Sequence, residues 1–232
     1  MLAHIVLFLS GILCPGQNSE NRFYEMRVDH DPNGIGKFYL GREIAHVMTH
    51  EGAGWLDRKE REKEENPRKL VDALKFSPNE TVVDLGAGSG YYSFLIAPKV
   101  AKVIAVDIQP EMLAIMDRKI KNSGVKNVEL LLGKEQDPGL RPSSVDTIIM
   151  VDVYHELAFP REVTRKLVDA LKTGGRVVFV EFRLEDPEVP IKLVHKMSEK
   201  QVLREMKEFP ELVPEPTIPI LPWQHVIVLR KK

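Results

Sequence analysis

Cysteine is almost absent from this sequence, and neither sign of charge is in excess. Cys14 is the only cysteine among 232 residues, which excludes a framework of disulfide bonds. The 33 lysine and arginine residues nearly balance the 34 acidic residues, and the net charge of −1 offers no general basic field to nucleic acid or to an anionic membrane. Internal repeats and low-complexity tracts are also missing. We therefore expect a globular protein that does not bind nucleic acid.

Long hydrophobic runs are missing as well, except at the start of the chain. Residues 2–13 are apolar but too short for a comfortable membrane span, and polar residues follow from Gln17. This pattern resembles a secretory leader over residues 1–19 and favours export to the periplasm or the medium, with the cytoplasm as the alternative. Against a leader, no lysine or arginine precedes the apolar run, and Leu13 rather than a small residue precedes Cys14. We expect no stable membrane span.

Residues 80–90 are the most informative stretch of the chain, with the sequence ETVVDLGAGSG. The apolar residues Val82, Val83 and Leu85 favour a buried parallel strand. Three glycines at alternate positions then favour a tight turn into a helix, where the backbone approaches a ligand closely and presents free N–H groups to it. Asp84 stands at the carboxyl end of this strand, which is the edge where open α/β sheets bind ligands.

The spacing of the glycines separates two classes of cofactor. A dinucleotide-binding loop has the pattern G-x-G-x-x-G, whereas Gly86, Gly88 and Gly90 give G-x-G-x-G. The carboxylate of Asp84 would repel a pyrophosphate but attract an ammonium group. The motif D-x-G-x-G-x-G resembles motif I of the class I S-adenosylmethionine-dependent methyltransferases, whose glycine loop holds the methionine part and the adenosine of the cofactor. The resemblance implies S-adenosyl-L-methionine as the cofactor.

The rest of the chain alternates apolar strands with amphipathic helices, which predicts an α/β fold with a doubly wound, mostly parallel, Rossmann-like sheet. The resemblance covers residues 67–183 well and implies a seven-stranded sheet whose last two strands form a reversed hairpin. The proline-rich residues 209–222 make the first arm of that hairpin doubtful. We expect the methyltransferase core over residues 77–232.

The cofactor site is expected at the carboxyl ends of these strands. Asp107 ends the second strand, where an acid grips ribose hydroxyl groups. The resemblance also places the segment around Glu135 beside the adenine. The residues that we expect to bind the cofactor are Asp84, Gly86, Ala87, Gly88, Gly90, Asp107, Ile108, Glu135 and Asp152.

Polar residues 152–156 follow the fourth strand, where the transferred methyl group is expected. His155 titrates near neutral pH and could accept a proton, so we select it with Tyr154 as the catalytic candidates. Alternatively, both side chains only form the wall of the pocket. The amide-methylating DNA enzymes carry an N/D-P-P-Y/F signature here, and its absence favours a small-molecule acceptor. Asp152 alone does not make the magnesium site of catechol-type enzymes.

Residues 20–76 are expected to form a helical cap over the cofactor. The pattern of residues 37–50 predicts a helix that places Glu43, His46 and His50 on one face. A metal site on that face is conceivable, but the set of ligands is thin, and we assign no metal site to this chain.

The cap also supplies candidates for contact with the substrate. Gly52-Ala53-Gly54 has the composition of a hinge, and the residues after it would lie on a lid that excludes water. An indole on such a lid could face the sulfonium through a cation–π contact or simply pack the lid onto the sheet. The lid residues that we select are Tyr39, Arg42, Trp55 and Arg58.

The sequence thus predicts S-adenosylmethionine-dependent methyl transfer to a small molecule. One alternative keeps the fold and the cofactor but not the reaction, as in a sensor or an accessory protein. Another is an NAD-binding oxidoreductase, which the glycine spacing and Asp84 disfavour. Neither the methyl acceptor nor the oligomeric state follows from the sequence.

Overall fold

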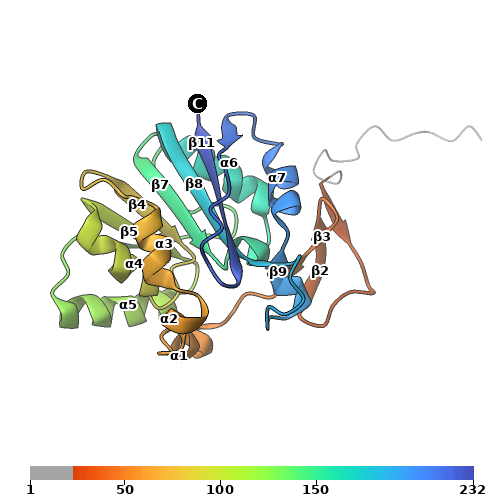
Figure 1. Cartoon of the computed structure of the whole chain (residues 1–232), viewed down its shortest axis with the longest axis horizontal. Coiled ribbons are helices and arrows are strands. Elements are labelled where there is room, and N and C mark those ends of the chain that lie inside the picture. The colour runs from red at the N-terminus through yellow and green to blue at the C-terminus, as the bar shows by residue number, and fades with distance from the viewer. Residues whose placement is uncertain (1–22) are drawn as a thin grey trace, which may run out of the picture.

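A twisted, mostly parallel β-sheet forms the centre of the molecule (Figure 1). We describe residues 23–232 from a computed structural model; the leader expected over residues 1–19 lies outside this range. The strands of the central sheet are β4 (Thr81–Leu85), β5 (Lys102–Asp107), β6 (Val128–Leu132), β7 (Val145–Val151), β8 (Leu171–Arg183), β9 (Lys196–Met197), β10 (Leu212–Pro214) and β11 (Gln224–Lys231).

The strand order confirms the predicted doubly wound topology. Seven strands pair in the order β10-β11-β8-β7-β4-β5-β6, and the short β9 pairs with β8. All pairs from β6 to β8 are parallel, whereas β11 runs antiparallel to both of its neighbours. The reversed hairpin therefore forms despite the prolines. Its first arm is a three-residue edge strand that ends at Pro214, where a missing N–H group is tolerated.

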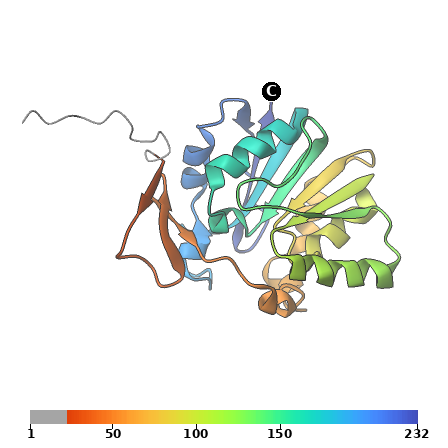
Figure 2. The same cartoon turned by 180° about the vertical axis from the view of Figure 1, so that it is seen from behind.

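Helices cover both faces of the sheet (Figure 1, Figure 2). On one face, helices α3, α4 and α5 bury residues such as Leu70, Ile96 and Met116 against the strands. On the other face, helices α6 and α7 bury residues such as Leu167 and Met206. The bounds of these helices are α3 (Pro67–Ala73), α4 (Tyr91–Ile96), α5 (Pro110–Ser123), α6 (Pro160–Ala170) and α7 (Glu199–Met206).

The prediction of a helix over residues 37–50 is wrong. The cap begins with a three-stranded antiparallel sheet of β1 (Tyr24–Met26), β2 (Gly34–Tyr39) and β3 (Arg42–Ala45). The two residues between β2 and β3 are Leu40 and Gly41, which both have positive φ, as a tight hairpin turn requires. This turn chemistry overrides the helical spacing of the apolar residues.

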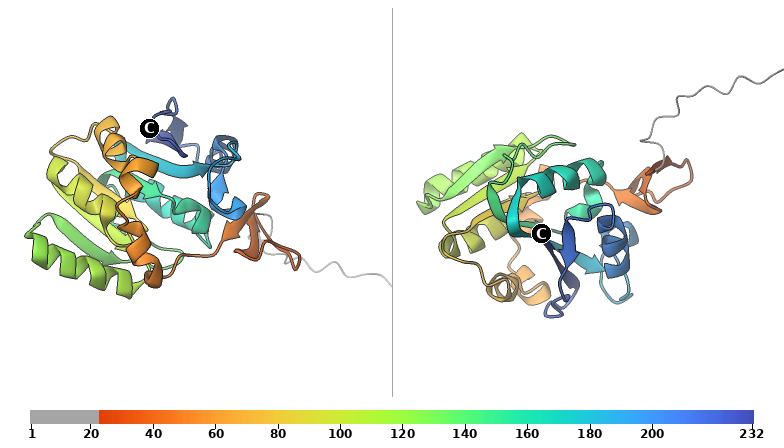
Figure 3. Two further views of the ribbon diagram at one scale, coloured as in Figure 1. Left: turned by 60° about the horizontal axis from the view of Figure 1, so that its bottom comes forward. Right: turned by 90° about the horizontal axis from the view of Figure 1, so that it is seen from above.

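The correction also removes the predicted helix face of Glu43, His46 and His50. Glu43 lies on β3, and its carboxylate accepts hydrogen bonds from the backbone N–H groups of Asp31 and Gly36. His46 follows β3, and His50 begins a separate short helix. The small sheet lies at one side of the molecule, where β3 contacts the segments that carry His155 and His195 (Figure 3).

The second half of the cap is helical, as predicted, but it is built of short pieces. They are η2 (His50–Gly52), α1 (Ala53–Leu56) and α2 (Arg61–Glu64), which lie near the carboxyl ends of the parallel strands (Figure 3). The cap is therefore half β-sheet and half helix. Among residues 23–232, no helix combines the length and the hydrophobicity that crossing a bilayer requires.

Candidate active site

A cavity of about 700 Å³ lies at the carboxyl ends of the parallel strands. Its volume falls in the range of roughly 300–1,000 Å³ that is usual for ligand pockets. The glycine loop after β4 and the residues that follow β5 and β6 line one end. Residues that follow β7 line the other end, together with His195 at the end of η5 (Leu193–His195), and the cap contributes His46, Met48, Trp55 and Leu56 to the lining. One continuous space thus joins the predicted cofactor end to the predicted acceptor end.

A larger side chain would not fit at either of the two loop glycines that line the cavity. Gly86 has a φ of +69°, and a Cβ atom there would lie 2.5 Å from a methyl group of Val153. Gly88 has a φ of +55°, and a Cβ atom there would lie 2.6 Å from a methyl group of Leu56. Both glycines line the cavity. The loop is therefore compact, and helix α1 of the cap packs directly on it.

Asp107, which we expect to bind the cofactor, lines the cavity. Its Oδ2 accepts a hydrogen bond of 2.8 Å from the backbone N–H of Gly88, and its Oδ1 accepts one of 2.9 Å from that of Gln109. Burial raises the pKa of this carboxyl group. Each carboxylate oxygen has a second acceptor position, so Asp107 can still bind hydroxyl groups of a ligand. The predicted contacts Ile108 and Glu135 line the same end.

Asp84 does not line the cavity in the described part of the chain. It lies behind the glycine loop, where its Oδ2 accepts a hydrogen bond of 2.6 Å from Ser93 Oγ. Burial raises the pKa of Asp84 to about 6. Ala87 and Gly90 are also absent from the lining, and Gly90 is the N-cap residue of α4. Contact of these three residues with a cofactor stays a prediction.

Asp152 presents an unpaired oxygen at the wall of the cavity. Its Oδ2 accepts a hydrogen bond of 3.3 Å from Gln224 Nε2, but its buried Oδ1 has no hydrogen-bond partner. Burial, together with the nearby charges of Glu65 and Glu181, raises the pKa of this carboxyl group well above its usual value. An ammonium group of a ligand would supply the missing hydrogen bond to Oδ1 and, by its positive charge, would favour the ionised carboxylate. The methionine part of S-adenosylmethionine carries such a group, so Asp152 fits the predicted cofactor.

Arg61 is a cavity residue that sequence reasoning missed. Its guanidinium is buried, donates to Glu65 Oε2 at 2.8 Å, and donates to the backbone oxygen of Leu56 at 3.0 Å. The side chain lines the cavity. In the sequence it belongs to a run of charged residues, which is usually a solvated surface, and nothing local distinguishes it.

A buried ion pair holds His155 at the end of the cavity where we expect the acceptor. His155 Nδ1 lies 2.6 Å from Glu181 Oε2, and Glu181 Oε1 accepts a hydrogen bond of 2.9 Å from the backbone N–H of Tyr154. Burial disfavours the charged imidazole, but the charge and hydrogen bond of Glu181 outweigh it and raise the pKa of His155. Because Nδ1 faces Glu181, Nε2 is the ring atom left for other partners.

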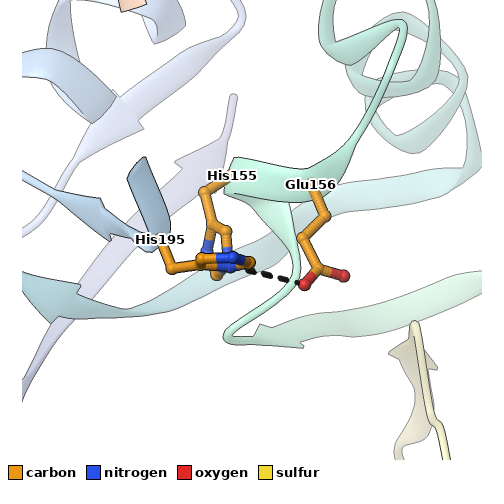
Figure 4. A group of neighbouring side chains, drawn as sticks. All are labelled: His155, Glu156 and His195. Atoms are coloured by element: carbon orange, nitrogen blue, oxygen red, sulfur yellow. Dashed lines mark hydrogen bonds and ion pairs between the residues drawn. The ribbon is translucent and has the colours of Figure 1, made fainter. Parts of the chain in front are cut away.

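Two further side chains meet His155 Nε2 (Figure 4). His195 Nδ1 lies 3.1 Å from it, and Glu156 Oε1 lies 3.8 Å from it. Burial and the charge of His155 lower the pKa of His195 to about 4, whereas burial raises the pKa of Glu156 to about 7. Sequence reasoning gave no role to Glu181 or His195. They stand 26 and 40 residues after His155, so no local pattern connects the three.

Three further predicted site residues do not line the cavity. Tyr154 is fully buried and packs edge-on against Phe179, so it has a packing position and not the predicted catalytic one. Tyr39 is fully buried in the small hydrophobic cluster of the cap. Arg42 forms an ion pair of 2.9 Å with Glu205 and donates to the backbone oxygen of His155. Arg42 therefore holds the cap to the core, whereas Tyr39 packs inside the cap, and neither residue lines the cavity.

The lid residues Trp55 and Arg58 lie together. Trp55 lines the cavity, and the guanidinium of Arg58 stacks on its ring at 3.7 Å and also pairs with Glu65. Arg58 itself is not in the lining. The side chain of Gln109 holds the segment before helix α1 to the core, because it forms hydrogen bonds with the backbone of both Met48 and His50.

These features together define a class of protein. The sheet order, the glycine loop after the first parallel strand and the acid at the end of the second strand are those of the class I S-adenosylmethionine-dependent methyltransferases. The chain belongs to the methyltransferase domain family, whose model matches residues 76–223.

Individual relatives agree with this assignment. The chain is 31% identical over 110 residues to a protein-L-isoaspartate O-methyltransferase of Pyrococcus horikoshii, and the match covers 47% of each chain. It is 34% identical over 104 residues to an arsenite methyltransferase of Halobacterium salinarum, which covers 44% of this chain and 27% of the relative. The chain thus spans about half the length, or less, of these curated relatives.

The fold also has a close match among solved structures. A SAM-dependent methyltransferase from Aquifex aeolicus superposes with a TM-score of 0.73 at 23% sequence identity. The superposition covers 80% of this chain and all of the Aquifex chain. At this identity the likeness concerns the fold.

Proposed function

We propose that this protein transfers a methyl group from S-adenosylmethionine to a small molecule that binds beside His155, Glu156 and His195. The observation that carries the proposal is the continuous cavity, which joins the glycine loop and Asp107 to these three polar side chains. Reactants that share one cavity can be held in contact, and alignment of that kind supplies much of the rate of a bimolecular transfer.

The chain's own residues suit the two ends of the cofactor. Asp107, Ile108 and Glu135 would hold the adenosine, and the glycine loop with the unpaired oxygen of Asp152 would hold the methionine part. Bound S-adenosylmethionine would supply a methyl group on a positively charged sulfur atom, which becomes neutral when an acceptor takes the methyl group. Cap residues such as His46, Met48, Trp55 and Leu56 line the cavity, and a cap in this place would help to exclude water.

The acceptor end favours a polar small molecule. It is lined by His155, Glu156 and His195, and Glu181 fixes the ring of His155 from the neighbouring strand. The surrounding wall is mostly apolar, and it includes Leu157, Val163 and Ile191. A polar group of the acceptor would contact the histidines, and the remainder of the molecule would pack on the apolar wall.

Calorimetric titration with S-adenosylmethionine, its demethylated product S-adenosylhomocysteine and NAD tests the cofactor. We expect both sulfur nucleosides to bind with dissociation constants in the micromolar range and NAD not to bind. Binding of NAD alone would favour the oxidoreductase alternative and reject the proposal.

Transfer itself requires a second measurement. The protein is incubated with methyl-labelled S-adenosylmethionine and a panel of small hydroxyl, thiol and amine compounds, and labelled products are separated by mass. We expect label in at least one product and its loss in His155→Ala, with cofactor affinity changed less than threefold. Tight cofactor binding without transfer to any compound would favour the sensor alternative.

A further inference from the structure

Three potential metal ligands converge from two segments that are distant in the sequence. His155 and Glu156 lie on η4 (Tyr154–Glu156) after β7, and His195 lies at the end of η5. Figure 4 shows the two imidazole rings and the carboxylate turned toward one another. Each of the three residues offers one ligand atom, and these three atoms all lie within 4.8 Å of one another.

The three ligand atoms have the separations that a metal ion requires. The distances are 3.1 Å from His155 Nε2 to His195 Nδ1, 3.6 Å from His195 Nδ1 to Glu156 Oε1, and 3.8 Å from Glu156 Oε1 to His155 Nε2. The centre of a triangle with these sides lies about 2.0 Å from each corner, which matches zinc–nitrogen and zinc–oxygen bonds of about 2.0–2.2 Å. No side chain would have to move far to bind an ion.

A second layer of hydrogen bonds holds these ligands in place. Glu181 bonds His155 Nδ1, which leaves Nε2 for the ion, and a carboxylate behind a ligating histidine is a usual feature of metal sites. The other oxygen of Glu156 accepts a hydrogen bond of 3.3 Å from the backbone N–H of Met48. Arg42 donates to the backbone oxygen of His155. The cap and the neighbouring strand thus both orient the group.

We propose that His155, Glu156 and His195 bind a divalent transition-metal ion, with zinc as the ion that best fits the ligands, and that a further coordination position opens into the cavity. Two histidines and one carboxylate with an open position form a ligand set that zinc enzymes use for catalysis. All three residues line the cavity, so a ligand in the open position would lie in the same space as the glycine loop. This proposal departs from the sequence analysis, which assigns no metal site to the chain.

The metal site also indicates a class of methyl acceptor, and this step rests on the proposed function. An oxygen or sulfur atom bound to a divalent ion loses its proton to water more readily, because the positive charge stabilises the anion. The acceptor is then a hydroxyl or thiol compound. With a metal ion on Nε2, His155 acts as a ligand and does not act as the proton acceptor that the sequence predicts.

Zinc titration of the full chain tests the site without any cofactor. The protein is freed of metal with EDTA, dialysed and titrated with zinc chloride in a calorimeter. We expect one equivalent to bind with a micromolar or lower dissociation constant, and His195→Ala to weaken binding at least 100-fold. His225→Gln is the matched control, because His225 also pairs with a glutamate but lies outside the cavity, and it should bind zinc like the wild type.

One further variant and one further measurement guard against simple misfolding. Glu181→Gln should weaken zinc binding by about 10–100-fold, as loss of a carboxylate behind a ligating histidine does elsewhere. Cobalt titration should give the visible absorption of a four- or five-coordinate ion in the wild type and in His225→Gln, but not in His195→Ala. Circular dichroism checks that each variant is folded.

The proposal is overturned if the wild type binds no zinc below 1 mM, or if His195→Ala binds it as tightly as His225→Gln does. Failure of the metal site can be distinguished from failure of the proposed methyl transfer. Titration of the metal-free protein with S-adenosylmethionine reports the cofactor site alone, so loss of one site leaves the measurement of the other intact.

Discussion

Glu181 Oε2 lies 2.6 Å from His155 Nδ1, and both side chains are buried. The two residues stand on neighbouring elements, since Glu181 is near the end of β8 and His155 follows β7. Glu181 uses its other oxygen to bond the backbone N–H of Tyr154. One carboxylate therefore fixes both the ring and the backbone of the segment that carries the candidate acceptor site.

Removal of this carboxylate should destabilise the fold and not only the site. We expect Glu181→Ala to lower the free energy of unfolding by about 3–5 kcal/mol, because it leaves buried donors without an acceptor. Glu181→Gln keeps one acceptor oxygen and should cost about half as much. Urea unfolding followed by circular dichroism measures both.

The matched control is the exposed pair of Glu185 and His225, whose atoms lie 2.8 Å apart. Because Glu185 is half exposed, Glu185→Ala should cost no more than about 1 kcal/mol. If Glu181→Ala and Glu185→Ala lowered the free energy of unfolding equally, burial of the pair of Glu181 and His155 would not be the cause of the larger loss that we expect.

Gly88→Ala should weaken cofactor binding through the cap. The new methyl group would meet Leu56 at 2.6 Å and would push helix α1 away from the glycine loop. We expect S-adenosylmethionine to bind at least tenfold more weakly. Leu56→Ala in the same chain should restore part of the affinity, which a calorimetric double-mutant cycle would detect.

Gly124→Ala is the control for backbone strain at this loop. Gly124 also has a positive φ of +70°, but a Cβ atom there would meet nothing within 4 Å. This variant should lose about 1–2 kcal/mol of stability and none of its cofactor affinity. If Gly124→Ala weakened binding as much as Gly88→Ala does, contact with Leu56 would not be the cause.

The parallel core could be predicted from the sequence because its signals are local. Each buried strand is a short apolar run, and the glycine loop with Asp84 and Asp107 occurs at fixed spacings along the chain. The hairpin of β2 and β3 could not be predicted from apolar spacing, because its determinant is the pair of positive-φ residues Leu40 and Gly41. Helical and strand periods are hard to separate in so short a segment.

The candidate acceptor site can be predicted only in part from the sequence, for a different reason. His155 was selected from its place after a parallel strand, and the structure puts it at the cavity. Its partners Glu181 and His195 come from other elements, so only the tertiary fold brings them together. Asp107 lies at the cavity because it directly follows a buried strand, whereas the side chain of Asp84 lies behind the glycine loop.

The stability of the protein should depend on pH through Asp84. Burial raises the pKa of Asp84 to about 6 in the folded state, from an ordinary value of 3.8. The folded state therefore binds this proton more tightly than the unfolded state does. The stabilisation from Asp84 is fully present below about pH 4 and is lost as the pH rises through 6.

The comparison of wild type with Asp84→Asn isolates this effect. Between pH 4 and pH 7, the wild type should lose free energy of unfolding relative to the variant, on the order of 3 kcal/mol. Asp117→Asn removes an exposed carboxylate and should show no such trend. Parallel curves of stability against pH for Asp84→Asn and the wild type would contradict the assignment.

The cap should open more readily when its tie to the glycine loop is removed. Asp57 follows helix α1, and its carboxylate accepts hydrogen bonds of 2.8 Å from Ser89 Oγ and 2.6 Å from Lys119 Nζ. These bonds join the cap to the core beside Gly88. They are partly exposed, so we expect Asp57→Ala to weaken cofactor binding by only about two- to fivefold.

Limited proteolysis measures the opening directly. In the wild type, S-adenosylmethionine should protect residues 50–58 from cleavage, because a closed cap buries its backbone against the loop. Asp57→Ala should be cleaved faster without the cofactor and should regain protection at saturating cofactor. Asp72→Ala removes the exposed partner of Lys99, away from the cavity, and should be cleaved at the rate of the wild type. Identical cleavage of Asp57→Ala and Asp72→Ala would mean that the carboxylate of Asp57 does not hold the cap closed.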